Sequence, residues 1–235
     1  MRGASLPAVA RADIAHVDTW VFDLDNTLYG ADIDLFHQID QRMKQYIARL
    51  LGVSVEKAFE LQKRYYRVHG TTLRGLMLFH NINADDFLEF VHDIDHSVLS
   101  AQPELAAALK ALPGRKVIYT NGSETHAAKV LVRLGIADIF DGIFDIRAGN
   151  YIPKPDPAPY IAMTNSLGLA PGRAAMFEDS FKNLKPAADL GMVTVWVRHT
   201  EHVAGPHEDT SHCRFVTDDV VGWLENAAVA LGNEP

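Results

Sequence analysis

The chain has 235 residues, 48% of them hydrophobic, with a formal net charge of −8 and a pI near 5.7. This acidic balance gives no support for a nucleic-acid polymer or a membrane surface as a partner. No segment is apolar for long enough to span a bilayer, and the Ala-rich leader Met1 to Asp18, expected to be mobile, lacks the apolar core of a signal peptide. The single cysteine, Cys213, cannot form an internal disulfide, and this fits a cytoplasmic protein. The length and the hydrophobic content predict one domain, or one domain with an insertion.

The first predicted strand, Thr19 to Leu24, leads into two carboxylates, Asp23 and Asp25. Its apolar run is continuous, which predicts a strand in the middle of a sheet. Alternate residues of a strand share a face, so the two acids are expected to point the same way. Like charges this close repel unless a cation lies between them or one acid stays protonated. A polar turn after a buried strand is the simpler alternative.

The following stretch, residues 32–99, has helical periodicity. Its first helix carries apolar residues at three- and four-residue spacing, at Leu35, Ile39, Met43, Ile47 and Leu50. Gly52 is expected to end this helix, and Ser54 to begin a second one that ends at Gly70. Shorter helices are predicted at Leu73 to His80 and Asp85 to His92. Residues 32–99 are therefore interpreted as an all-helical cap inserted into a core of residues 1–31 and 100–235, since ligands bind beyond the C-terminal ends of parallel strands.

One loop of the expected cap carries groups that suit substrate contact. It contains the flexible Gly70, the hydroxyls of Thr71 and Thr72, and the cation of Arg74. Loops of this composition often reach a ligand. The alternative is that the whole helical segment has only a packing role.

The second strand end has the features of an anion site. A helix from Pro103 to Ala111 is followed by the β-rich run from Lys116 to Tyr119 and then by Thr120, Asn121 and Gly122 at the start of another helix, which ends at Gly135. A hydroxyl, free backbone N–H groups and a helix N-terminus can converge on one phosphate. Capping of the helix by Ser123 or Thr120 is the alternative explanation.

A rigid loop follows, in which three prolines hold Lys154 within the segment Tyr151 to Pro157. An exposed loop lysine is usually only solvated. A lysine whose backbone is restrained on both sides suits a point charge that neutralises phosphate oxygens.

The last acidic cluster is Glu178 and Asp179, at the end of the apolar strand that begins at Ala174, with Asn183 one helical turn beyond. The segments predicted after it are a strand at Met192 to Val197, a polar stretch at Glu201 to His212, a short strand at Phe215 to Val216 and a helix at Asp218 to Leu231. The histidines of the polar stretch match no metal-site spacing and are interpreted as surface residues. Alternation of strands and helices predicts an α/β fold with a right-handed, doubly wound parallel sheet.

The strand-end motifs, in this order, resemble those of the haloacid dehalogenase superfamily. They are Asp23-Leu24-Asp25-Asn26-Thr27-Leu28, Thr120-Asn121-Gly122, Lys154-Pro155-Asp156-Pro157 and Glu178-Asp179-Ser180. The resemblance covers Trp20 to Val197 and implies a Rossmann-like core with an inserted helical cap. The first motif continued to Tyr29, together with the cap segment Gly70 to Leu76, is most similar to the pyrimidine 5′-nucleotidase-like group.

The resemblance implies a Mg²⁺-dependent phosphate monoester hydrolase. Asp23 is the expected nucleophile, which forms an aspartyl-phosphate, and Asp25 the general acid and then base. The ion is expected on a carboxylate oxygen of Asp23, the backbone carbonyl of Asp25, and Asp179. Thr120, the Asn121 N–H and Lys154 are expected to hold the phosphoryl oxygens. Glu178 is expected either to bind the ion or to orient Lys154. Asn183 is expected to support the residues that bind the ion and the phosphate.

The substrate is less defined by sequence than the reaction. Pyrimidine nucleoside monophosphates are favoured by the resemblance alone, and phosphoglycolate or a sugar phosphate is the alternative. A phosphomutase shares every motif. A 2-haloacid dehalogenase has no use for Asp25 and Asp179, and a phospho-receiver module places its acids before its Thr and Lys. A binding protein without catalytic activity is a further alternative, but it would not explain why all the charged groups needed for the chemistry are present. The sequence predicts no oligomeric state.

Overall fold

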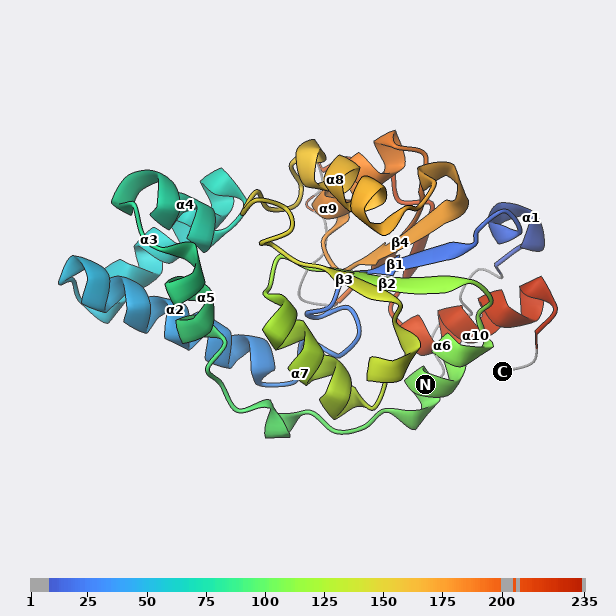
Figure 1. Ribbon diagram of the computed structural model, residues 1–235, viewed down its shortest axis with the longest axis horizontal. Helices are drawn as coiled ribbons and strands as arrows, with labels where there is room; N and C mark the ends of the chain where they lie inside the picture. The colour runs from blue at the N-terminus through green and yellow to red at the C-terminus, as the bar shows by residue number, and fades with distance from the viewer. Residues whose placement is uncertain (1–8, 200–204, 206–207, 234–235) are drawn as a thin grey trace.

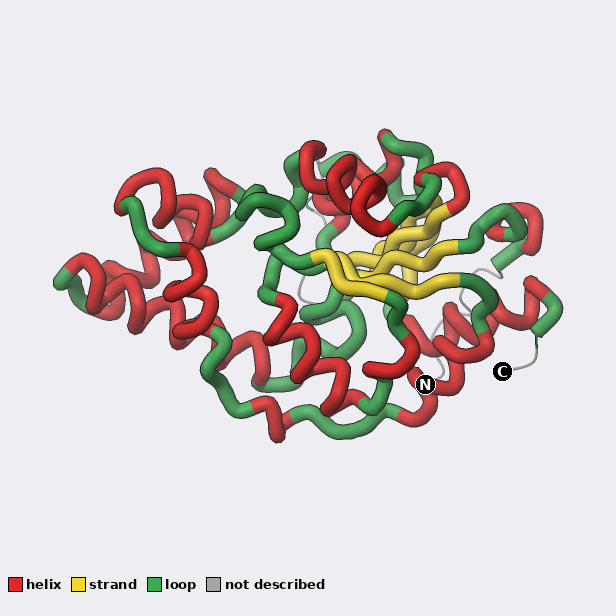
Figure 2. Tube along the Cα trace, viewed as in Figure 1, coloured by secondary structure: helices red, strands yellow, loops and turns green. Residues whose placement is uncertain are grey.

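The computed structural model describes residues 9–199, 205 and 208–233. Within them six strands form one parallel sheet, in the order β3-β2-β1-β4-β5-β6 (Figures 1 and 2). The strands are β1 Thr19–Phe22, β2 Arg115–Tyr119, β3 Gly142–Phe144, β4 Ala174–Glu178, β5 Val193–Val197 and β6 Phe215–Thr217. The chain moves outward from β1 to β3 and returns to β4 on the other side, as in a doubly wound sheet. The predicted fold class is confirmed.

β1 lies at the centre of the sheet, between β2 and β4. Trp20 and Phe22 pack into one core and Val21 into the other, which explains the uninterrupted apolar run. Phe22 pairs in register with Ile118 and with Phe177. The residues that follow β1, β2 and β4 therefore leave the sheet at the same level.

Helices cover both faces of the sheet (Figure 1). One face carries α6 Pro103–Ala111, α7 Glu124–Leu134 and α10 Val220–Leu231, and the other carries α8 Pro157–Leu167 and α9 Phe181–Asp189. Leu109 and Leu224 are fully buried on the first face, and Tyr160 and Leu184 on the second. Burial of these apolar faces is the main force that holds the layers together.

Four further helices lie at one end of the sheet (Figure 1), and they are α2 Leu35–Leu51, α3 Val55–His69, α4 Thr72–His80 and α5 Ala84–Val91. They share a hydrophobic cluster of their own, which includes Ile47, Leu76 and Phe87. Ser54 begins α3 by accepting a hydrogen bond from the Lys57 N–H at 3.3 Å, as predicted. A separate core and a position beyond the strands support the division into a cap of residues 32–99 and an α/β core, which we retain as a proposal.

The described part of the leader is packed, which corrects the expectation of a mobile segment up to Asp18. A short helix, α1 Arg11–Ile14, contacts α10, and Ile14 and Val17 are buried in the core. Single apolar residues separated by charged ones gave no periodic signal in the sequence. Residues 1–8 lie outside the described residues.

Two features near the sheet edges were also absent from the sequence-based expectations. The short edge strand β3 was not predicted, because only three residues form it. His212 is half-buried rather than a surface residue, and its Nε2 lies 2.7 Å from the carbonyl oxygen of Phe181. His202 and His207 lie outside the described residues. Among the residues that the structure covers, no helix has the length and apolarity needed to cross a membrane.

Candidate active site

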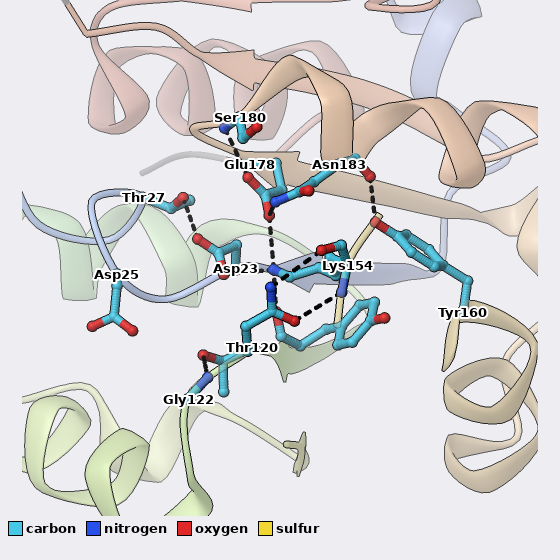
Figure 3. Close-up of polar contacts among 12 residues, drawn as sticks. Asp23, Asp25, Thr27, Thr120, Gly122, Lys154, Tyr160, Glu178, Ser180 and Asn183 are labelled. Carbon is cyan, nitrogen blue, oxygen red and sulfur yellow. Dashed lines mark hydrogen bonds and ion pairs between the residues drawn. The ribbon is translucent and has the colours of Figure 1, made fainter. Parts of the chain in front are cut away.

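The predicted charged residues from β1, β4 and the proline-rich loop meet at one point beyond the sheet (Figure 3). Lys154 Nζ lies 2.6 Å from Asp23 Oδ1 and 2.7 Å from Glu178 Oε1. These residues come together because the two strands run in parallel register and end at the same level.

Lys154 is only 2% exposed, and each of its three ammonium protons has an acceptor. Besides the two carboxylates, Nζ donates to the Tyr119 carbonyl at 2.9 Å. The Asn121 side chain fixes the loop, because its Oδ1 accepts the Lys154 backbone N–H at 2.9 Å. Burial alone would lower the pKa of Lys154, but Asp23 and Glu178 outweigh this effect and raise it. The two acids therefore favour the charged form of Lys154.

Asp23, Glu178 and Asp179 form an acidic cluster in which carboxylate oxygens lie within 4.8 Å of one another. Burial raises the pKa of Asp23 to about 7, against the opposing effect of Lys154. Burial, and then the charge of Asp23, raise the pKa of Asp179 to about 6. A divalent cation stabilises the ionised forms of such acids, and three hard oxygen donors fit Mg²⁺.

Glu178 uses both of its oxygens on protein donors. Oε1 accepts from Lys154 and from Asn183 Nδ2 at 2.7 Å, and Oε2 accepts the Ser180 N–H at 2.8 Å. Burial raises the pKa of Glu178 to about 7, with Lys154 opposing the shift. Of the two roles left open by the sequence, this geometry favours orientation of Lys154. Asp179, whose backbone carbonyl accepts from Trp196 Nε1 at 2.8 Å, is then the better candidate for direct metal binding.

The Asp25 carboxylate lies apart from this cluster (Figure 3), contrary to the expectation that Asp23 and Asp25 point the same way. β1 ends at Phe22, and the chain then turns, with Asn26 in the left-handed conformation at φ 60°. Asp25 Oδ1 instead accepts hydrogen bonds from Tyr29 Oη at 2.6 Å and His126 Nε2 at 2.8 Å. Burial opposes ionisation of Asp25, but His126 and Tyr29 prevail and lower its pKa to about 2.

Thr120 Oγ1 and Asp25 Oδ2 both lie close to Gly122. A Cβ placed on Gly122 would lie 3.2 Å from Thr120 Oγ1 and 3.6 Å from Asp25 Oδ2. Thr120 Oγ1 accepts the Gly122 N–H at 2.9 Å, which leaves its hydroxyl proton to be donated. The helix cap is Ser123, whose Oγ accepts the His126 N–H at 3.3 Å. The capping alternative thus applies to Ser123, and Thr120 stays a candidate for phosphate binding.

The cap loop reaches the core beside Lys154. A Cβ on Gly70 would lie 3.1 Å from Pro153 Cγ and 3.3 Å from the Lys154 carbonyl oxygen. Within the cap, Thr71 Oγ1 accepts the Arg74 N–H at 3.1 Å, and Thr72 Oγ1 donates to the Gln62 carbonyl at 3.4 Å. Thr72 thus uses its hydroxyl proton within the cap, whereas Thr71, like Thr120, only accepts and keeps its hydroxyl proton for donation. Thr71 and the half-buried Arg74 are the candidates for substrate contact that we retain.

Three residues of the site were missed by the sequence analysis. Thr27 Oγ1 donates to Asp23 Oδ2 at 2.9 Å, and Tyr29 and His126 donate to Asp25. The first two lie within the quoted acidic motif. His126 lies 101 positions from Asp25, and its only sequence signal is that it shares a helix face with the apolar Val130.

Known proteins share both the sequence pattern and the fold. The family model of haloacid dehalogenase-like hydrolases matches residues 17–191. Phosphate metabolism protein 8 of Saccharomyces cerevisiae is 30% identical over 189 residues, which are 73% of this chain and 58% of the yeast protein, so the chain spans less than two thirds of that relative. A phosphoglycolate phosphatase of Neisseria gonorrhoeae is 29% identical, with 79% of this chain and 82% of that protein covered.

Solved structures agree on the fold. A phosphatase of Thermococcus onnurineus has a TM-score of 0.62 at 22% identity, with 93% of this chain and 99% of that one covered. The L-2-haloacid dehalogenase RSc1362 has a TM-score of 0.59 at 17% identity, with 90% and 98% covered. The family model spans most of the chain and all of the strand-end motifs described above. The chain therefore belongs to the haloacid dehalogenase-like hydrolases.

Proposed function

We propose that the protein is a Mg²⁺-dependent phosphatase that forms an aspartyl-phosphate and acts on pyrimidine nucleoside 5′-monophosphates. The observation that carries the proposal is the buried contact of Lys154 with Asp23 and Glu178, with Asp179 beside them. Cleavage of a phosphate monoester needs mainly positioning and charge neutralisation, and this cluster supplies both signs of charge.

The reaction begins with attack of the Asp23 carboxylate on phosphorus, which breaks the bond to the leaving oxygen and forms the acyl phosphate. Asp25 gives its proton to the leaving alcohol and then takes one from the water that releases phosphate. Thr120 and the Asn121 N–H donate to the phosphoryl oxygens, and Lys154, whose three protons have acceptors within the protein, contributes its positive charge. Mg²⁺, when bound by an Asp23 carboxylate oxygen, the Asp25 carbonyl and Asp179, neutralises charge on the nucleophile and the phosphoryl group.

The proposed nucleotide substrate rests on the first motif and the cap segment, and one cap residue supports it. Tyr66 of α3 is 58% exposed. Burial, and then the charges of Asp179 and Glu178, raise the pKa of Tyr66, so its hydroxyl lies within electrostatic reach of these acids. An exposed aromatic ring near a phosphate site is suited to stack on a base. Arg74 is the cap cation proposed to contact the same substrate.

Phosphoglycolate is the second candidate substrate. It is favoured by one observation, the match to the Neisseria gonorrhoeae phosphoglycolate phosphatase over 79% of this chain. This substrate has no base, so Tyr66 would make no stacking contact with it. Replacement of Tyr66 by alanine, with Tyr66→Phe as the control that keeps the ring, separates the two cases. A nucleotidase is expected to show a raised KM for the nucleotide in Tyr66→Ala alone.

A phosphate-release screen of the purified protein tests the proposal. The panel contains UMP, CMP, AMP, phosphoglycolate and glucose 6-phosphate, with Mg²⁺ or with excess EDTA. Mg²⁺-dependent release that is fastest from UMP or CMP is expected. Fastest release from phosphoglycolate would overturn the substrate, substrate turnover without free phosphate would indicate a mutase, and halide release from 2-chloropropionate would indicate a dehalogenase.

A further inference from the structure

We propose that His126 is a positioning residue for the general acid Asp25, and that His92 and His96 of the segment leaving the cap hold His126 in place. The proposal rests on the phosphatase function proposed above. It concerns a chain of contacts that runs from Asp25 through α7 to the C-terminal end of α5.

The two oxygens of Asp25 have different surroundings. Oδ1 accepts from both Tyr29 Oη and His126 Nε2, at 2.6 and 2.8 Å. Oδ2 lies beside Gly122, close to the proposed phosphate-binding Thr120 Oγ1. Two donors on one oxygen fix the rotation of the carboxyl group and leave the other oxygen for proton transfer. Oδ2 is therefore the atom that gives its proton to the leaving group.

The donor, His126, is held in place by its neighbours. His126 is fully buried in the first turn of α7. Its ring stacks on His92 with centroids 4.4 Å apart and planes 12° from parallel. Its Nδ1 lies 3.3 Å from His96 Nε2. His92 is itself held, because its Nδ1 lies 2.9 Å from Ser123 Oγ, the atom that caps α7.

The hydrogen bonds of His126 and His96 have a fixed direction on one side. With the proton of the general acid on Oδ2, Asp25 Oδ1 only accepts, as does a backbone carbonyl, so His126 Nε2 donates to Asp25 and His96 Nδ1 donates to the Ile94 carbonyl at 3.1 Å. The remaining nitrogens, His126 Nδ1 and His96 Nε2, face each other 3.3 Å apart.

His92 and His96 belong to the segment that connects α5 to the core. His92 follows α5 directly, and His96 lies in the short 3-10 helix His96–Val98 that returns the chain to the core. Arg133 of α7 fastens the same segment, because its Nε donates to the His96 carbonyl at 3.1 Å. The position of this connecting segment relative to α7 therefore fixes the orientation of the His126 ring. Through His126 it also fixes the orientation of the Asp25 carboxyl group.

The test uses leaving groups of different quality. An alkyl phosphate, such as the nucleotide or phosphoglycolate selected by the screen, needs the general acid, whereas p-nitrophenyl phosphate carries a good leaving group and needs it much less. His126→Phe keeps a ring in the stack and removes the donor. We expect kcat to fall about 10- to 100-fold on the alkyl phosphate, less than the roughly 10²- to 10⁴-fold contribution of general acid–base catalysis because Asp25 itself remains, and to change little on p-nitrophenyl phosphate.

Further variants exclude a general structural effect. Tyr29→Phe removes the second donor on the same oxygen with less change in packing, and the same selective loss is expected. His126→Gln restores a side-chain donor and is expected to recover part of the alkyl phosphate rate. In an Asp25→Asn background, His126→Phe is expected to add no further loss. His37→Phe, an exposed histidine of α2, is the control.

Equal loss on both substrates in folded His126→Phe and Tyr29→Phe would overturn the inference, because it would show a role in the fold. Full activity of both variants on the alkyl phosphate would overturn it as well. A wild-type protein that releases phosphate from no monoester would instead overturn the proposed function, and this inference with it.

Discussion

Two carboxylates that are two residues apart occupy opposite environments in this site. Asp23 faces Lys154, Glu178 and Asp179, and burial raises its pKa to about 7. Asp25 faces His126 and Tyr29, which lower its pKa to about 2 against the effect of burial. The proposed roles need the reverse, an ionised Asp23 and a protonated Asp25, so each pKa has to shift when ligands bind. A phosphoryl group bound beside Asp25 adds negative charge and moves its pKa upward, toward the range of a proton donor.

Replacement of Asp25 by alanine is expected to separate catalysis from metal binding. Its carboxylate lies outside the acidic cluster, and its proposed metal ligand is a backbone oxygen, which remains in the variant. We expect kcat to fall by about 10²- to 10⁴-fold while the affinity for Mg²⁺ stays within about threefold. Steady-state kinetics and calorimetric titration measure the two quantities, with the exposed Asp218→Ala as control. A parallel loss of Mg²⁺ affinity would contradict this separation.

The raised pKa values of Asp23 and Asp179, about 7 and about 6, predict a pH-dependent metal affinity. Protons compete with the ion for carboxylate oxygens, so affinity falls as the pH falls through these values. We expect the dissociation constant for Mg²⁺ to be at least about tenfold higher at pH 5 than at pH 8. Titration calorimetry in buffers of different ionisation enthalpy measures both the affinity and the protons released. An affinity that is constant over this range would show that the acids are already ionised without the metal.

At the scale of helices and strands, local sequence signals predicted the elements that present the site. Ser54 begins α3, and Gly52, Gly70 and Gly135 follow the ends of three helices, as expected from their capping preferences. The short strand β3 and helix α1 were not predicted, because three or four residues carry no periodic pattern. Contacts decided by tertiary packing, such as that of His126 with Asp25, had no local signal either.

The packing of α4 on α3 gives a prediction at this scale. A Cβ on Gly75 would lie 2.4 Å from Tyr65 Cγ, closer than two carbon atoms can approach. Gly75→Ala is therefore expected to lower the free energy of unfolding by about 1–3 kcal/mol, the usual cost of overpacking. Urea denaturation measures it, with Gly172→Ala, where an added Cβ meets nothing within 4 Å, as the matched control. Equal stability of both variants would mean that the two helices are not packed this closely.

At the scale of the whole molecule, the site is assembled from residues that the sequence separates by more than 100 positions, such as Asp23 and Lys154. The ordered motifs predicted that these groups meet, because parallel strands end at one level. The direction of each side chain depends on the turn after β1 and on the cap. That is why the sequence predicted the acids of the site but not the separation of Asp23 from Asp25.

Metal binding is expected to stabilise the entire fold. An ion that binds only the folded state adds about 2.7 kcal/mol at a concentration 100 times its dissociation constant. For a chain of this size, we expect Tm to rise by roughly 5–10 °C at such a Mg²⁺ concentration. Asp179→Asn is expected to lose most of this rise, as measured by thermal denaturation. A rise that is as large in Asp179→Asn would place the ion elsewhere.

Trapping of the phosphorylated enzyme tests the central claim most directly. The protein is mixed with a ³²P-labelled monoester that it hydrolyses, quenched in acid within the first turnover, and digested to peptides. The account predicts an acid-stable, hydroxylamine-sensitive phosphate on the peptide that carries Asp23, and no label in a folded Asp23→Asn variant. Full hydrolytic activity in Asp23→Asn, or label on a different residue in the wild type, would contradict it.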